Sequence, residues 1–143
     1  MLFRSWLFDE TRALVDRLGL RERVVFLDTP HDEDMVALYG GATAVALPSH
    51  YEGFGLPVLE AMACGTPVVI SDRGSLPEIA GEAALAVDPD DAGALAAALE
   101  RVWRDSELRA MLRQKGLNRA AEFSWERCAQ ETLAVYQHVL RET

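Results

Sequence analysis

Basic residues are scarce in this 143-residue sequence, and lysine is nearly absent. The chain has 14 Lys and Arg against 23 Asp and Glu, for a net charge of −9, and Lys115 is the only lysine. A nucleic-acid partner needs a clustered basic face that neutralises phosphates, so the composition excludes such a partner. The negative charge repels polyanions, but local backbone dipoles can still hold a small anion.

Cysteine is also rare. The chain has only Cys64 and Cys128, and neither lies in a CxxC or Cys/His pattern of the kind that binds a metal. Both fall in apolar helical patterns, so we expect them to be buried small hydrophobic residues. Free cysteines of this kind indicate a reducing compartment.

Long hydrophobic runs are absent as well. No stretch reaches the roughly 18 apolar residues of a membrane span, and the start, MLFRSWLFDETR, lacks the pattern of a secretory signal. We therefore expect a cytoplasmic protein with at most a peripheral association with a membrane. Its length, without repeats or linkers, predicts a single domain over residues 1–143.

What the sequence does contain is an alternation of short apolar runs and helical patterns. Four runs are predicted to be strands: Val24–Leu27, Thr43–Leu47, Pro67–Ile70 and Ala84–Val87. They are continuously apolar, which is typical of parallel strands covered on both faces. Strands that alternate with helices predict an α/β fold, here a Rossmann-like, doubly wound parallel sheet.

Helices are predicted where apolar residues recur every three or four positions. Their expected ranges are Trp6–Leu18, Asp32–Tyr39, Leu56–Cys64, Leu76–Ala80, Ala92–Trp103, Glu107–Glu122 and a last helix after Ser124. Ser124 is the expected N-cap of that last helix, with Phe123 and Cys128 as a hydrophobic staple. A run of helices therefore closes the chain.

The segment SHYEGFGLPVLEAMACGTPVV, residues 49–69, carries the main functional signal. It follows the second predicted strand, and ligands of parallel sheets bind beyond the carboxyl ends of strands. Gly53 and Gly55 permit close backbone approaches, and Pro57 suits the first turn of a helix. The amides of residues 54–56 are therefore expected to be free at a helix N-terminus, where an anion is favoured.

Two glutamates flank these amides. Glu60 lies about one turn into the helix among apolar neighbours, so we expect it to be buried and to need hydrogen-bond donors. Glu52 lies in the loop and is free to face the same cleft. Two carboxylates around free amides suit a ligand with hydroxyls and phosphates, such as a nucleotide-sugar. An acid favoured by the helix dipole and an ordinary glycine turn explain the same spacing equally well.

The pattern SxxEGFGLPxLEAMAxGxPVV resembles the signature of the retaining GT-B glycosyltransferases of family 4 (glycosyl transferases group 1), which use nucleotide-sugar donors. The resemblance covers nearly the whole chain, from LGLRERVVFL through LYGGATAVALPS to the tail LRAMLRQKGLNRAAEFSWERCAQETLAVY. It implies half of a GT-B fold, namely the C-terminal, nucleotide-sugar-binding domain. It also implies a bacterial hexosyltransferase of polysaccharide biosynthesis that uses GDP-mannose or a UDP-sugar, a glycan or lipid-linked acceptor, and no metal or other cofactor.

The same resemblance implies roles for individual residues. Glu52 is the implied catalytic residue, close to the donor sugar and the departing diphosphate, and Glu60 is implied to hold the ribose hydroxyls. The amides of residues 54–56 are implied to bind sugar hydroxyls or the diphosphate. The expected donor-binding residues are Ser49, His50, Glu52, Gly53, Phe54, Gly55, Leu56 and Glu60. For His50, a solvated loop position is the alternative.

The sequence departs from the family pattern at its start. The family's second domain opens with two more βα units, the first of which carries an Arg/Lys pair that neutralises the donor diphosphate. Nothing before Trp6 supplies that pair, and Arg73 is the best placed remaining candidate. The strand Val24–Leu27 must then pair with Thr43–Leu47 or leave an exposed edge.

Two functions therefore remain in view. An enzyme needs the N-terminal GT-B domain as its partner, so we expect little or no transfer by this chain alone. The alternative is a non-catalytic nucleotide-sugar-binding or interaction module that retains the fold. The lack of the basic pair favours the module, and the intact loop with Glu52 and Glu60 favours the enzyme.

Overall fold

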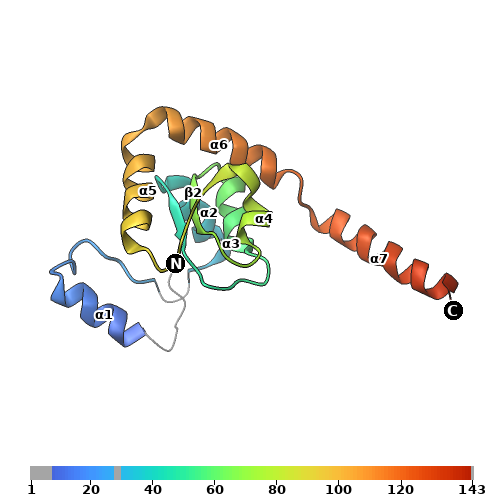
Figure 1. The fold of residues 1–143 in the computed structure, drawn as a ribbon, viewed down its shortest axis with the longest axis horizontal. Helices are drawn as coiled ribbons and strands as arrows, with labels where there is room; N and C mark the ends of the chain where they lie inside the picture. Colours follow the sequence, from blue (N-terminus) through green and yellow to red (C-terminus); the bar gives the residue numbers. More distant parts are fainter. Residues whose placement is uncertain (1–7, 28–29, 143) are drawn as a thin grey trace. The chain divides into compact units, whose positions relative to one another are not determined.

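The computed structural model describes residues 8–27 and 30–142 (Figure 1). The chain divides into two compact units, residues 1–35 and 36–143. Helix α1 (Phe8–Arg17) lies in the first unit, and helix α2 (Asp32–Gly41) crosses the boundary. The expectation of one domain over residues 1–143 stays a prediction.

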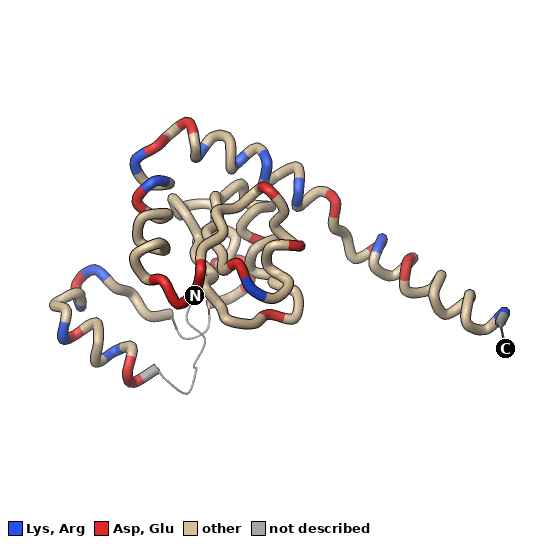
Figure 2. The backbone as a smooth tube through the Cα atoms, in the orientation of Figure 1, with Lys and Arg blue, Asp and Glu red and all other residues tan. Residues whose placement is uncertain are grey.

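Charges at the two ends of α1 match the helix dipole. Asp9 and Glu10 lie in its first turn and Arg17 in its last, which Figure 2 shows as red at the start and blue at the end. Negative groups stabilise a helix start and positive groups a helix end. Gly19 follows with a φ of 66°, and its amide donates to the carbonyl of Asp16. The predicted helix is confirmed over residues 8–17, while Trp6 and Leu7 lie outside the described residues.

The predicted strand at Val24–Leu27 was wrong. These four residues have no regular secondary structure, and the side chain of Val25 is 80% exposed. The Val24 amide donates to the carbonyl of Leu20 at 3.1 Å, which closes a turn and not a sheet ladder. A run of β-branched residues becomes a strand only beside a hydrogen-bonding neighbour, and residues 24–27 form no strand.

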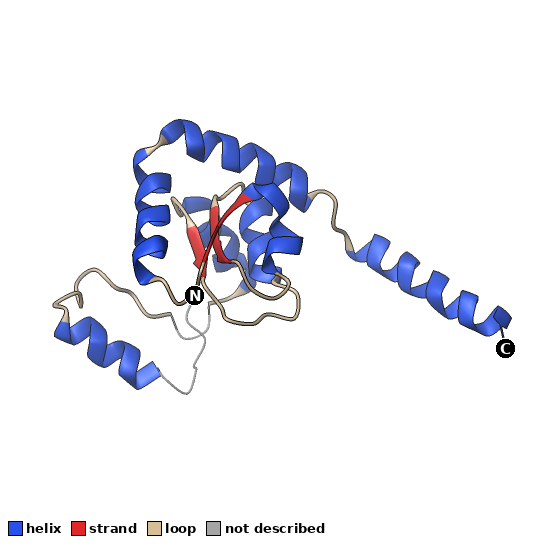
Figure 3. Cartoon of the chain, viewed as in Figure 1, coloured by secondary structure: helices blue, strands red, loops and turns tan. Residues whose placement is uncertain are grey.

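Three parallel strands form the sheet of the second unit, in the order β1-β2-β3 (Figure 3). They are β1 (Val45–Leu47), β2 (Val68–Ser71) and β3 (Ala84–Val87). All four residues of the central strand β2 are buried, as its continuous apolar run predicts. The expected α/β, Rossmann-like fold with a parallel sheet is confirmed, with three strands in place of about four.

Helices cover the sheet on either side (Figure 1). Their bounds are α3 (Leu56–Ala63), α4 (Leu76–Ala80), α5 (Ala92–Arg104) and α6 (Ser106–Ala120), with a 3₁₀ turn at Gly81–Ala83. Helix α5 packs on β2 and β3, α3 packs on β1 and β2, and α6 lies against both α3 and α5. The strands therefore lie between helices, and the loops beyond their carboxyl ends are the part of the sheet edge available to bind a ligand.

The core under α5 and α6 is apolar and tightly packed. Val69 of β2 meets Ala98 and Val102 of α5 and Leu112 of α6, and all four are buried. Gly116 lets α6 approach α3 closely, since a Cβ there would lie 3.2 Å from Cγ of Met62. Burial of such side chains is the main favourable term in folding.

The last helix, α7 (Trp125–Glu142), begins as predicted and packs differently. Ser124 Oγ accepts a hydrogen bond from the Arg127 amide at 3.1 Å, which confirms the N-cap. The predicted burial of Cys128 was wrong, because Cys128 is exposed. Phe123 meets Phe54 edge-on, with ring centroids 6.1 Å apart. The hydrophobic staple between Phe123 and Cys128 stays a prediction.

Exposure extends along the whole of α7. Every side chain described between residues 124 and 141 is exposed, including Leu133, Tyr136 and Leu140. This explains the failed prediction for Cys128, because an amphipathic pattern predicts burial only where another element covers the apolar face. Cys64, the C-cap residue of α3, is half-buried, so the expected burial is met only in part at this position.

None of the helices described for this chain combines the length and the apolar character needed to cross a bilayer.

Candidate functional site

A loop beyond the carboxyl end of β1 holds most of the residues that the sequence singled out. This Glu52 loop, residues 48–55, connects β1 to α3 and contains neither helix nor strand. Because all three strands are parallel, the loops that follow β2 and β3 lie at the same edge of the sheet. This is the edge at which ligands of open parallel sheets bind.

The Glu52 loop ends at Gly55, where the backbone conformation favours glycine. Gly55 has a φ of 102° and is the N-cap residue of α3. A Cβ at this position would lie 2.6 Å from Cδ2 of Leu76, so the loop packs closely on α4. Pro57 lies in the first turn of α3, and no side chain caps this helix. The positive end of the helix dipole thus has no side-chain acceptor, an arrangement that favours an anion.

Glu60 is exposed, so the prediction that it is buried was wrong. Val58, Ala61 and Met62 are the buried residues of α3. Successive helical residues are about 100° apart, and Glu60 falls on the face opposite to these three. The apolar composition of the segment concealed this division, because several of its small residues do not need burial.

Tyr39 holds the Glu60 carboxylate in place. Its side chain is 6% exposed, and its hydroxyl donates to Oε2 of Glu60 at 3.1 Å. Burial, and then the charge of Glu60, raise the pKa of Tyr39 to about 12, so the hydroxyl keeps its proton at neutral pH. Thr66 Oγ1 donates to the Tyr39 carbonyl at 2.5 Å, and this hydrogen bond joins α2 to the turn between α3 and β2.

The eight expected site residues differ in exposure. Gly55 is buried, and Ser49 and Glu52 are half-buried. The other five are exposed, and these are His50, Gly53, Phe54, Leu56 and Glu60. Seven of the eight lie in the Glu52 loop or at the first residue of α3, and Glu60 lies one turn further along that helix.

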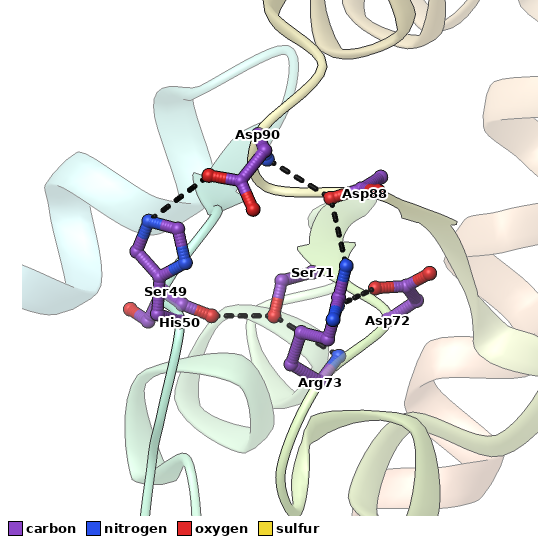
Figure 4. A network of polar contacts seen from close by, with 7 residues as sticks. All are labelled: Ser49, His50, Ser71, Asp72, Arg73, Asp88 and Asp90. Atoms are coloured by element: carbon purple, nitrogen blue, oxygen red, sulfur yellow. Dashed lines mark hydrogen bonds and ion pairs between the residues drawn. The ribbon is translucent and has the colours of Figure 1, made fainter.

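A polar network joins the three loops at this edge (Figure 4). Arg73, which is the only Lys or Arg between residues 36 and 100, lies at its centre. Its Nε donates to Oδ1 of Asp72 at 2.9 Å, and its Nη2 donates to Oδ1 of Asp88 at 3.1 Å. His50 Nε2 lies 3.7 Å from Oδ1 of Asp90. The network therefore connects the loops that follow β1, β2 and β3.

The charged groups in this network shift one another's pKa values toward the charged forms. The backbone amide of Asp90, and then Arg73, hold the pKa of the Asp88 carboxyl below its ordinary value. Asp88 and Asp72 in turn raise the pKa of Arg73. Arg73 therefore stays charged, and its charge is shared between two carboxylates.

The segment that begins at the last residue of β2 also holds the backbone of the Glu52 loop. In this serine segment, residues 71–75, the Ser71 hydroxyl donates to the carbonyl of Ser49 at 2.5 Å. The Ser75 hydroxyl lies 2.9 Å from the carbonyls of both Glu52 and Phe54. The Glu52 loop thus depends on side chains from a neighbouring loop for its backbone hydrogen bonds.

The sequence singled out Arg73 in the serine segment but did not reveal what Ser71 and Ser75 contact. The available signal was the polar run SDRGS, which begins at the last residue of a fully buried strand. Tyr39 was missed as well, because on its helix it counts as one more apolar residue. Hydrogen bonds between loops depend on tertiary structure, and the spacing of one segment does not reveal them.

Within the described ranges, 8–27 and 30–142, no group of three or more His, Cys, Asp and Glu side chains has an arrangement that could hold a metal ion.

Comparison with known proteins gives this geometry a context. The profile of the family described as Glycosyl transferases group 1 matches residues 7–119. O-antigen chain mannosyltransferase B from Escherichia coli is 43% identical over 136 residues, which cover 94% of this chain and 35% of that protein. MMP alpha-(1->4)-mannosyltransferase from Mycolicibacterium hassiacum is 40% identical over 134 residues, which cover 91% of this chain and 33% of that protein. The chain spans about a third of the length of these curated relatives.

Solved structures share the fold. Sucrose-phosphate synthase from Thermosynechococcus elongatus superposes with a TM-score of 0.86 at 35% identity, covering 94% of this chain and 35% of that one. Anabaena HepE in complex with UDP-glucose superposes with a TM-score of 0.84 at 26% identity, covering 91% of this chain and 36% of that one. The C-terminal domain of a group 1 family glycosyl transferase, LpcC from Francisella tularensis, gives 0.70 at 30% identity, covering 81% and 63%.

Proposed function

The chain belongs to the glycosyl transferases group 1 family, as the C-terminal region of a GT-B-type glycosyltransferase, and we propose that it forms the donor-binding part of such an enzyme. The proposed reaction transfers a hexose, with retention of configuration, from a nucleotide-sugar to a glycan or lipid-linked acceptor. The names of the two mannosyltransferase relatives support a mannose donor, for which we propose GDP-mannose. The UDP-glucose in the HepE complex supports a UDP-sugar as the alternative.

The observation that carries this proposal is the arrangement around the start of α3. An uncapped helix N-terminus lies between Glu52, in the loop before it, and Glu60, on its first turns. The helix dipole favours the diphosphate of the donor, while the two carboxylates accept hydrogen bonds from its hydroxyls. Tyr39 keeps the Glu60 carboxylate in one position for the ribose.

The chemical step breaks the bond between the sugar C1 and the diphosphate oxygen and forms a bond between C1 and an acceptor hydroxyl oxygen, whose proton passes to the leaving diphosphate. Negative charge develops on the leaving nucleoside diphosphate, and groups that stabilise this charge lower the barrier. The backbone amides of residues 54–56 are proposed to serve here, and Glu52 is proposed to stabilise the positive charge that develops on the sugar ring. Arg73 is a poor substitute for the family's basic pair, because Asp72 and Asp88 already share its charge.

The pairing of Arg73 also supports the second candidate function. A sheet edge with three acidic side chains, Asp72, Asp88 and Asp90, and one paired cation stabilises a diphosphate poorly. A nucleotide-sugar-binding or interaction module without catalysis is therefore the alternative. With this chain alone, both functions predict little or no transfer. Transfer from a radiolabelled donor in the presence of the N-terminal GT-B domain separates them, because only the enzyme part restores turnover there.

The remaining parts of the proposal concern what is not needed. The nucleotide-sugar is a substrate, no metal or other cofactor takes part, and no nucleic acid is bound. The protein is proposed to work in the cytoplasm, with at most a peripheral association with a membrane. Loss of nucleotide binding on addition of a chelator would contradict the proposal that no metal takes part.

An amide chemical-shift titration of the 143-residue chain tests the proposal. GDP, GDP-mannose, UDP and UDP-glucose are added separately, and saturable shifts are expected at residues 49–60 and 71–78. Glu60→Gln should weaken binding about tenfold, because a carboxylate is the stronger acceptor for ribose hydroxyls. Glu126→Gln, at an exposed position of α7, is the matched control. A folded spectrum without shifts at millimolar ligand would overturn the proposal.

A further inference from the structure

The backbone of the Glu52 loop has few ways to form hydrogen bonds of its own. Residues 48–55 lie in neither helix nor strand, so their carbonyls find partners elsewhere. Three of these carbonyls, at Ser49, Glu52 and Phe54, accept hydrogen bonds from the serine segment. The loop is therefore fixed at its beginning, middle and end by one neighbouring segment.

Ser71 makes the first of these connections from inside the protein. It is the last residue of the central strand β2, and its side chain is 0% exposed. Its hydroxyl donates to the Ser49 carbonyl at 2.5 Å and accepts from the Arg73 amide at 3.3 Å. A buried hydroxyl that is used in both directions fixes the two groups it touches relative to the sheet.

Ser75 makes the second connection, on both sides of Glu52. Its Oγ lies 2.9 Å from the carbonyl of Glu52 and 2.9 Å from that of Phe54, so its single proton is shared between the two. Gly74, directly before Ser75, fits closely against the backbone of Glu52. A Cβ on Gly74 would lie 3.3 Å from the carbonyl oxygen of Glu52 and 3.4 Å from its amide nitrogen.

The position of Ser75 makes this contact informative. Ser75 is the N-cap residue of α4, where a serine hydroxyl ordinarily accepts a hydrogen bond from its own helix. No such bond forms, and the hydroxyl donates to the Glu52 loop instead. Helix α4 therefore has no side-chain N-cap hydrogen bond from Ser75, whose hydroxyl binds the Glu52 loop instead.

We propose that Ser71 and Ser75 are positioning residues that orient Glu52 toward the donor sugar. This inference rests on the proposed function, since it takes Glu52 as the group that contacts the sugar. Neither serine needs to touch the ligand. Arg73, between them, is held by Asp88, so the serine segment is itself anchored to the loop after β3. A catalytic group gains rate when neighbouring residues hold it in place before the ligand arrives.

Three variants test the proposal in the 143-residue chain. Ser75→Ala removes the hydroxyl, and Ser75→Thr keeps it. Ser106→Ala is the matched control, because Ser106 lies at the start of α6 in an exposed position. Amide hydrogen exchange without ligand, and the dissociation constants for GDP and GDP-mannose, or for UDP and UDP-glucose, are measured for each.

We expect Ser75→Ala to speed amide exchange in residues 49–55 about tenfold, as for the loss of one hydrogen bond. The same variant should weaken binding of the sugar nucleotide about tenfold and binding of the nucleoside diphosphate less than twofold. A general loss of structure would weaken both ligands equally. Ser75→Thr should restore both readouts, and Ser106→Ala should change neither.

Other outcomes overturn the proposal or separate it from the proposed function. Unchanged exchange in Ser75→Ala, or equal weakening of both ligands, overturns it. If the unchanged chain binds neither pair of nucleotides, the proposed function fails, while faster exchange in the variant still supports Ser75 as the residue that holds the loop. If Ser75→Ala unfolds, Ser71→Ala provides the same comparison through the Ser49 carbonyl.

Discussion

Tyr39 shows how one side chain couples a buried position to an exposed carboxylate. Burial and the Glu60 charge raise its pKa from 10.0 to about 12, so the native state holds the phenolic proton more tightly than the unfolded chain does. The free energy of unfolding should therefore be unaffected below about pH 10 and should fall by up to about 3 kcal/mol between about pH 10 and 12. Chemical denaturation across this range measures the decrease.

Two variants show whether Tyr39 is responsible for this alkaline decrease. Tyr39→Phe should be less stable at neutral pH, because Glu60 loses its donor, and should lose little further stability between about pH 10 and 12. Tyr136→Phe, at an exposed position of α7, should behave like the unchanged chain. An identical decrease in Tyr39→Phe would assign the effect to other groups.

Gly55 and Gly53 provide a matched pair within one loop. Gly55→Ala should lower the free energy of unfolding by about 1–3 kcal/mol, because of its positive φ and the 2.6 Å approach to Leu76. Nothing lies within 4 Å of a Cβ on Gly53, so Gly53→Ala should change it by about 0.5 kcal/mol or less. Urea denaturation measures both, and equal effects would show that Gly55 is not under steric constraint.

Among the elements, the loops after β2 and β3 are joined by a charge contact. Arg73→Gln should raise the pKa of Asp88, although not to its ordinary value, because the Asp90 amide still donates to that carboxylate. Carboxyl chemical shifts followed against pH measure the change. Arg104→Gln, which removes a similar surface pair with Glu100, should leave Asp88 as it is. A pKa of Asp88 that does not move would mean that the loops are not coupled in solution.

The elements also show how far the sequence could be read. The three strands that form are continuous apolar runs, and the patterns around them predicted each helix to within a few residues. Val24–Leu27 has the same composition and forms no strand, because a strand depends on a neighbour that local composition does not reveal. The Glu52 loop could be found from the sequence because glycine, proline and glutamate have distinctive backbone and charge properties wherever they occur. Ser75 and Tyr39 were not assigned roles, because their roles depend on contacts with residues distant in the sequence.

At the scale of the whole molecule, α7 contributes little to the stability of the described fold. A chain that ends at Ser124 should have a free energy of unfolding within about 1 kcal/mol of that of the full chain, since the described side chains of α7 are all exposed. Leu112→Ala, in the core between α5 and α6, should cost about 2–5 kcal/mol. Chemical denaturation of both proteins gives the comparison. A large loss on removal of α7 would mean that its apolar face is covered in solution.

The acidic side chains beyond the strand ends also affect how fast a ligand arrives. Asp72, Asp88 and Asp90 lie in the loops after β2 and β3, at the sheet edge of the proposed site, in a chain of net charge −9. A nucleoside diphosphate is itself an anion, so it approaches against repulsion, and dissolved salt screens this repulsion over about 10 Å. The association rate should therefore rise with ionic strength, the reverse of electrostatic steering. Stopped-flow mixing at low and high salt measures this rate, and a rate that falls as salt is added would show that the acidic side chains do not repel the ligand.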